Sequence, residues 1–226
     1  MKLSTDSVLL GAWTKTENAE AAIDIGTGCG VLALMLAQKG IKKISAVESD
    51  MHAAMQASGN FNSSPWPQKF ECICVDVHAI AKDLRQHFDL IISNPPYFQG
   101  QVPSPSEERN KARHANGEPA QFRATWFESA YILGNDKSEL NLIFPFTDEA
   151  DWLESAGKAG WYIKRICRVR GKEKTEYSRT LACFSKMLTE LPVEETLTIE
   201  TEIRGIYTEA YRKLTKDFYL ERVFNR

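Results

Sequence analysis

The chain has 226 residues, 43% of them hydrophobic, and a formal net charge of −2 at pH 7. This length is typical of one α/β domain with a sizeable core, and the low net charge excludes binding of a polyanion through the field of the whole molecule. The sequence contains no run of about eighteen apolar residues and no secretion signal, so we expect a cytoplasmic protein without a membrane partner. Its five cysteines form no CxxC pair, and we therefore expect neither a disulfide framework nor a metal site.

From Ala21 onward, short β-rich apolar runs alternate with longer amphipathic stretches, which predicts an α/β fold with a parallel sheet. The expected strands lie at residues 21–25, 43–47, 70–75, 88–93, 139–146, 161–169 and 179–186. The expected helices lie at residues 31–39, 50–61, 77–86, 120–133, 148–158 and 207–220. Residues 99–119 are rich in Pro, Ser, Glu and Arg and should form a long loop.

A glycine-rich turn joins the first expected strand to the first helix. Glycines permit a tight turn there and let the backbone approach a ligand at the N-terminus of the helix. The spacing is GxGxG, with Val31 in place of the third glycine of the dinucleotide-binding pattern, and this favours S-adenosylmethionine over NAD. The candidate cofactor-binding residues of the turn are Asp24, Gly26, Thr27, Gly28 and Gly30.

Two further acidic positions follow the second and third strands. Glu48, with Ser49 after it, could accept hydrogen bonds from both hydroxyls of a ribose, and Asp76, with Val77, could meet an adenine amino group. Either acid alone could be a solvated residue at a strand end. Because the carboxyl ends of parallel strands meet at the edge where open sheets bind ligands, these acids together with the glycine turn predict an S-adenosylmethionine site.

The motif Asn94-Pro95-Pro96-Tyr97 follows an apolar strand. The lone pair of an exocyclic amino group is delocalised until acceptors hold its hydrogens. Asn94 offers an amide oxygen, and Pro95 offers a carbonyl on a backbone stiffened by both prolines. Tyr97 offers a face for stacking a base, worth about 1 to 3 kcal/mol. The motif suits adenine N6 and a glutamine amide equally, needs no metal, and has a simple Pro-Pro turn as its structural alternative.

Basic residues gather between Lys158 and Lys174, where seven cations stand against the single acid Glu173. Such a run could contact RNA phosphates, and a solvated basic face is the alternative interpretation. The candidate RNA-binding residues within the run are Lys164, Arg165 and Arg168.

With these motifs in place, the chain resembles the bacterial tRNA(Val) adenine-N6 methyltransferases. The resemblance covers residues 1–13, 24–28, 46–48, 62–66, 90–98, 111–114 and 207–220. It implies a Rossmann-like class I S-adenosylmethionine-dependent methyltransferase fold, with a mostly parallel seven-stranded sheet and helices on both faces. It also implies methylation of N6 on adenine 37, beside the anticodon of tRNA(Val).

The same resemblance places further residues around the site. Thr5 and Asp6 should lie against the methionine end of the cofactor, while Arg109, Lys111 and Arg113 could meet the anticodon-loop backbone. We expect a monomer with one domain over residues 1–226, made of a segment flanking the cofactor site (1–20), a catalytic core (21–188) and a C-terminal extension (189–226). Ser7 replaces a more usual glycine, which is tolerable if the backbone there has no positive φ.

Three alternatives stay open. The first two are an N5-glutamine methyltransferase acting on a protein such as a release factor, and another RNA or DNA adenine-N6 methyltransferase. The third is a non-catalytic module that binds S-adenosylmethionine or RNA, against which the intact tetrapeptide argues. Residues 207–220 favour the tRNA enzymes, because the glutamine methyltransferases share the tetrapeptide but not this ending.

Overall fold

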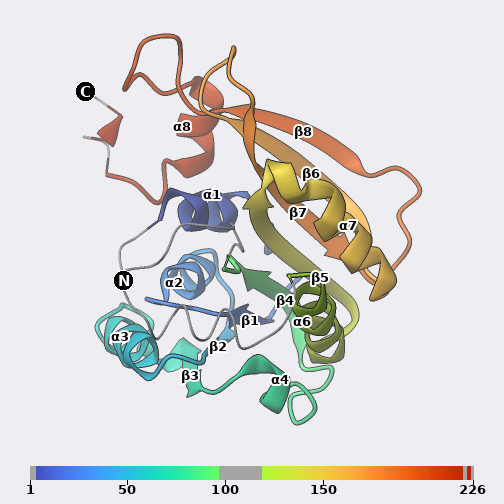
Figure 1. The fold of residues 1–226 in the computed structure, drawn as a ribbon. Helices are drawn as coiled ribbons and strands as arrows, with labels where there is room; N and C mark the ends of the chain where they lie inside the picture. The colour runs from blue at the N-terminus through green and yellow to red at the C-terminus, as the bar shows by residue number, and fades with distance from the viewer. Residues whose placement is uncertain (1–3, 97–118, 221–222, 225–226) are drawn as a thin grey trace.

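The computed structural model describes residues 4–96, 119–220 and 223–224, and one sheet of eight strands forms its centre (Figure 1). The strands are β1 (Ala21–Ile25), β2 (Lys43–Glu48), β3 (Phe70–Cys74), β4 (Phe88–Ser93), β5 (Gly134–Pro145), β6 (Tyr162–Arg170), β7 (Tyr177–Ser185) and β8 (Val193–Thr198). Their order is β3-β2-β1-β4-β5-β7-β6-β8. The first five are parallel neighbours, β7 runs antiparallel between β5 and β6, and β8 pairs with β6 in parallel.

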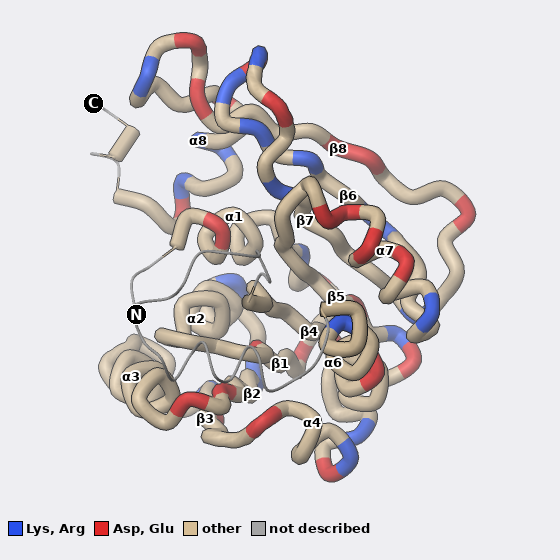
Figure 2. Tube along the Cα trace, in the orientation of Figure 1, with Lys and Arg blue, Asp and Glu red and all other residues tan. Residues whose placement is uncertain are grey.

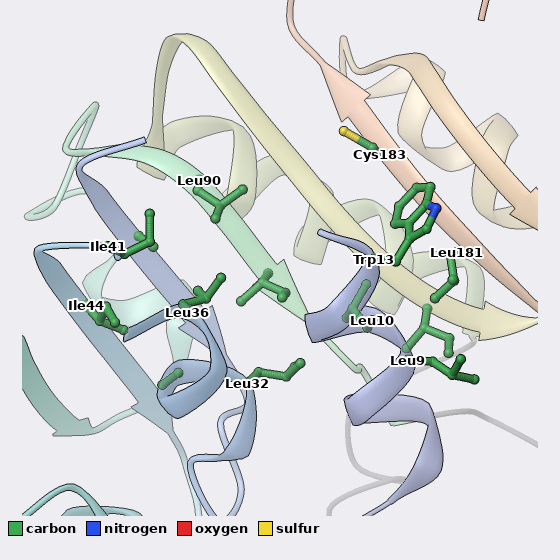
Figure 3. Packing of buried hydrophobic residues seen from close by; sticks show 14 of the residues in the cluster. Leu9, Leu10, Trp13, Leu32, Leu36, Ile41, Ile44, Leu90, Leu181 and Cys183 are labelled. Carbon is green, nitrogen blue, oxygen red and sulfur yellow. The ribbon is translucent and has the colours of Figure 1, made fainter. Parts of the chain in front are cut away.

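Helices cover both faces of this sheet, as predicted. They are α1 (Thr5–Trp13), α2 (Val31–Gln38), α3 (Met51–Asn62), α4 (Val77–Ile80), α6 (Pro119–Leu133), α7 (Glu149–Lys158) and α8 (Glu209–Thr215), with short 3-10 turns η1 (Pro67–Lys69) and η2 (Phe146–Asp148). Side chains of a strand alternate between the faces, so Ala22 belongs to the core that α1, α2, α3 and α8 share, whereas Ile23 belongs to the core that α4, α6 and α7 share. Figure 3 shows the first of these cores, where Leu10 of α1 and Leu36 of α2 approach the strands.

The fold confirms the predicted α/β class and the predicted strands, but the sheet has eight strands rather than seven. The sequence reasoning missed β8 and also the helix α1. Two helices are shorter than expected: the helix predicted at residues 77–86 ends at Ile80, and the one predicted at 207–220 is α8 alone. The loop predicted at residues 99–119 lies outside the described residues up to position 118.

No helix in the described part of the chain combines the length and apolarity that a membrane crossing requires.

Candidate active site

The glycine turn after β1 has the tight backbone that its sequence predicts. Gly26, Gly28 and Gly30 have φ values of 70°, 59° and 86°, a region that side chains with a Cβ rarely adopt. The N–H groups of Gly26 and Thr27 both donate to the carbonyl of Val47 on β2, at 2.8 and 3.0 Å. The turn is therefore fastened to the neighbouring strand, and α2 begins directly after it with its N-terminus at the carboxyl edge of the sheet.

Asp24 is fully buried beneath this turn. Its Oδ2 accepts hydrogen bonds from Thr27 Oγ1 at 2.6 Å and from the Ala33 backbone N–H at 3.2 Å. Its Oδ1 has no hydrogen-bond partner among the described residues. Burial removes the carboxyl from water and raises the pKa of Asp24 to about 7, although the bond from Thr27 acts in the opposite direction.

Glu48 ends β2 and bridges two backbone segments. Its Oε2 accepts from the N–H of Gly28 at 2.9 Å, and its Oε1 accepts from the N–H of Asp50 at 3.0 Å. The structure thus brings Glu48 to the glycine turn, as the sequence predicted. Ser49 beside it is exposed.

Asp76 lies at the corresponding position after β3, where it caps α4. Its Oδ1 accepts from the N–H of His78 at 2.8 Å, and its side chain is exposed. Val77 is buried against the core formed with α6, and the His78 ring contacts Ser129 of α6 at 2.6 Å. Asp76 is therefore held at the same sheet edge as Asp24 and Glu48.

Asn94 and Pro95 follow β4 at this edge. Ser93 Oγ donates to the carbonyl of Ile25 at 2.7 Å, which fixes the end of β4 beside the start of the glycine turn. Asn94 is half-buried, Pro95 is buried and Pro96 is exposed. Tyr97 lies outside the described residues.

Helix α1 lies next to Asn94 and supplies two contacts that the sequence reasoning did not anticipate. The Asn94 Nδ2 donates to Ser7 Oγ at 3.0 Å and to Ser4 Oγ at 3.4 Å. Of the two residues that were predicted here, Thr5 is exposed and Asp6 forms an ion pair with Arg179 of β7 at 2.8 Å. Ser7 lies in the helix and has no positive φ, so the helix does not require a glycine there.

The predicted RNA-binding cations of β6 do not form one patch. Lys164 pairs with Glu139 at 2.5 Å, and Arg165 donates to the Trp13 carbonyl at 2.7 Å. Arg168 instead binds Glu149 of α7 and Glu194 of β8, at 2.8 and 2.9 Å. Because α1 and α7 cover opposite faces of the sheet, the run is divided between those faces. Arg109, Lys111 and Arg113 lie outside the described residues.

Comparison with known proteins shows which proteins the chain is similar to. Residues 3–112 match the model of the methyltransferase small domain. A tRNA1(Val) (adenine(37)-N6)-methyltransferase from Histophilus somni (strain 2336) is 37% identical over 222 residues, which cover 97% of this chain and 91% of the relative. An enzyme of the same name from Tolumonas auensis is 38% identical, with 97% and 90% covered.

Solved structures with low identity share the fold. A protein from Agrobacterium tumefaciens, described as a predicted O-methyltransferase, superposes with a TM-score of 0.73 at 16% identity and covers 94% of this chain and 96% of its own. An M. jannaschii protein in complex with AdoMet superposes with a TM-score of 0.53 at 14% identity, with 83% and 79% covered. These likenesses agree with the Rossmann-like class I architecture predicted from the sequence.

Proposed function

The chain belongs to the family of the tRNA1(Val) (adenine(37)-N6)-methyltransferases, and on that premise we propose that it methylates N6 of adenine 37 in tRNA(Val). The observation that carries the proposal is the position of Asn94-Pro95 at the end of β4, beside the glycine turn. An acceptor for the hydrogens of a planar amino group and a cofactor-binding turn therefore share one edge of the sheet.

The residues of this edge fit S-adenosylmethionine, the cofactor of the family. The cofactor supplies a methyl group on a sulfonium ion. The exposed backbone at Gly26 lies at positive φ, and a Cβ built on it would meet no atom within 4 Å, so the turn leaves room for a close ligand. We propose that Glu48 binds the ribose of the cofactor and that Asp76 accepts a hydrogen bond from its adenine amino group. Ser49 and Val77 would lie beside them. Asp24, Thr27, Gly28 and Gly30 shape the turn, and Thr5 and Asp6 would border the methionine end.

Asn94 and Pro95 act on the acceptor nitrogen. Because the Asn94 amide nitrogen faces α1, the amide oxygen lies at the other end of the group, where it can accept from the amino group of the base. The Pro95 carbonyl would accept the second hydrogen on a backbone that both prolines hold rigid. Such fixed acceptors stabilise the positive charge that builds on nitrogen during attack, and the product then loses its proton easily.

The remaining roles are proposals for the RNA side of the site. Tyr97 would stack the base, Pro96 would set its approach, and Arg109, Lys111 and Arg113 would contact phosphates of the anticodon loop. The internal ion pairs of Lys164 and Arg168 give these two residues structural partners and weaken an RNA role for the β6 run. We further propose that the protein works in the cytoplasm as a monomer, with all 226 residues in one methyltransferase domain, because the core joins α1 to α8.

Incubation with methyl-labelled S-adenosylmethionine tests the function. The substrates are unmodified tRNA(Val), the same tRNA with adenine 37 replaced by guanine, and a release factor. We expect label in N6-methyladenosine from the first tRNA only, and we expect Asn94→Ala to lower turnover about 100- to 1000-fold with cofactor binding retained. Label in both tRNAs would assign the enzyme to another adenine. Label in N5-methylglutamine of the release factor alone would contradict the tRNA assignment.

A further inference from the structure

Helix α1 begins with two serine hydroxyls that contact Asn94. Ser4 is the N-cap of the helix, and its Oγ accepts from the Ser7 backbone N–H at 3.1 Å. The Ser4 and Ser7 hydroxyl oxygens lie 3.0 Å apart, so they form a connected pair. Both oxygens accept from the same atom, Asn94 Nδ2, at 3.4 and 3.0 Å.

An amide side chain has two unlike ends, and in the structure the serine pair contacts the nitrogen end. The amide NH2 group has two hydrogens to donate and no acceptor capacity, whereas the amide oxygen only accepts. A hydroxyl can donate as well as accept, but both serine oxygens accept from the nitrogen here, and the two bonds hold that end of Asn94 at α1. The oxygen is directed away from α1, which is the orientation that an amino-group substrate needs.

The serine pair sits on a helix whose other contacts prevent it from shifting. Near its N-terminus, Asp6 pairs with Arg179 of β7 at 2.8 Å. At its C-terminus, the Lys39 ammonium group of α2 donates to the carbonyls of Gly11 and Ala12, at 3.1 and 2.9 Å, and also to that of Thr14. Residues Ser7 to Trp13 are all buried. The position of the two hydroxyls is thus set by the fold and not by the local loop.

We propose that Ser4 and Ser7 are positioning residues for methyl transfer, which hold the Asn94 amide nitrogen so that its oxygen meets the acceptor amino group. The proposal rests on the proposed function of Asn94. Without the hydroxyls the Asn94 amide loses two of the bonds that hold its nitrogen at α1, so orientations that direct the NH2 group at the substrate become accessible. Loss of the pair therefore lowers turnover and leaves the binding of cofactor and tRNA intact.

The first test compares Ser7→Ala with Thr14→Val under steady-state conditions. Thr14 is the matched control because it is a buried hydroxyl of the same region, bonded to the Leu10 carbonyl at 2.8 Å, at the opposite end of α1. We expect kcat of Ser7→Ala to fall about 10-fold, with the KM values for cofactor and tRNA within twofold of wild type. Thr14→Val should retain kcat. An unchanged kcat in Ser7→Ala, or an equal loss in Thr14→Val, would overturn the proposal.

The second test separates positioning from general support of the helix. Single-turnover rates are measured for Ser7→Ala, Asn94→Ala and the double variant. If the serine acts through Asn94, the double variant is no slower than Asn94→Ala alone. Independent, multiplying losses would contradict the proposed coupling.

Ser4 provides the conservative rescue. Ser4→Thr keeps both the helix cap and the hydroxyl and should retain kcat, whereas Ser4→Ala loses both. A kcat for Ser4→Thr as low as that of Ser4→Ala would count against the role of the hydroxyl.

All rates are taken relative to wild type on whichever substrate the wild-type protein methylates. If that substrate is a glutamine amide, the tRNA assignment fails, and the effect of Ser7 on Asn94 is still measured. Failure of the tRNA assignment and failure of the proposed role of the serines are therefore distinguishable.

Discussion

The carboxylates in the two halves of the sheet have different kinds of partner. In the half built from β1, β2 and β3, the acids Asp24, Glu48 and Asp76 accept hydrogen bonds from backbone N–H groups, and Asp24 also from a threonine hydroxyl. None of these three acids takes part in an ion pair with another described residue. In the half built from β5 to β8, the cations of β6 pair with acids of β5, β8, α7 and the turn after β6, and Figure 2 shows these charges gathered there.

On the proposed function, this difference separates Glu48 and Asp76, whose charges would serve a ligand, from the paired charges that serve the fold; Asp24 is buried and supports the turn. A backbone N–H fixes the direction of a carboxylate but does not neutralise it, so the charge remains available to a bound molecule. An arginine both fixes and neutralises its partner, as Arg168 does for Glu149. The comparison can be tested by changing one carboxylate or cation at a time.

The largest effect is expected at Asp24, whose pKa is raised to about 7 by burial. A carboxyl whose pKa is higher in the folded than in the unfolded state stabilises the fold at low pH and loses that contribution as pH rises from about 4 to about 7. A shift of about three units corresponds to about 4 kcal/mol. Urea denaturation without cofactor gives the unfolding free energies of wild type and of Asp24→Asn. The wild-type value minus the variant value should fall by up to about 4 kcal/mol between pH 4 and pH 8.

Glu154 provides the control for that experiment, because its carboxylate is exposed on α7. Glu154→Gln should follow the pH dependence of wild type above pH 5. Parallel pH profiles for wild type and Asp24→Asn would show that the buried carboxyl does not titrate in this range.

Glu48→Gln should weaken cofactor binding about 10- to 100-fold, or about 1.4 to 2.8 kcal/mol. Glutamine keeps only one acceptor oxygen, so either Gly28 or Asp50 loses the partner of its N–H group. Isothermal titration with S-adenosylmethionine measures the affinity, and the melting temperature should change little. Unchanged affinity would place the ribose elsewhere.

Arg168→Met should lower stability without changing cofactor affinity, which is the reverse of the result expected for Glu48→Gln. It leaves Glu149, whose side chain is 14% exposed, without its cation and removes the pair with Glu194. We expect a loss of about 1 to 2 kcal/mol of unfolding free energy, since the site is partly screened by water. Cofactor affinity should stay at the wild-type value. A loss of tRNA affinity with a reduced salt slope would instead return Arg168 to the RNA interface.

The smallest effect is expected at the exposed pair of Lys158 with Glu154 on α7. Lys158→Ala should leave melting temperature, cofactor affinity and turnover unchanged, because water screens both groups. A measurable loss of tRNA binding alone would assign this end of the basic run to the substrate.

The sequence predicts those parts of the site that depend on local spacing. The glycine turn, Glu48 and Asp76 each follow a strand, and parallel strands bring their carboxyl ends to one edge without further information. The same logic places Asn94. Neighbours within a few residues along the chain are enough for all of these predictions.

The features that were missed depend on distant partners. Helix α1 is buried on nearly all sides, so its residues show no amphipathic period. Strand β8 carries Glu194 and Glu195, whose pairing with the arginines of β6 follows only from the register of the sheet. The contact of Ser7 with Asn94 likewise joins positions that no local pattern relates.

The anchors of α1 also set the order in which the chain can complete its site during synthesis. Trp13 Nε1 donates to Glu195, 182 residues later, and Asp6 pairs with Arg179, 173 residues later. When Asn94 has just left the ribosome, the nascent chain contains the glycine turn and Asn94. It does not yet contain Arg179 and Glu195, the two distant anchors of α1. Contacts over such separations form late in folding. Lys39 of α2 can hold the C-terminal end of α1 early, but the helix beside Asn94 gains its anchors on β7 and β8 only when translation is nearly finished. Premature termination before β7 would therefore yield a protein without a completed site.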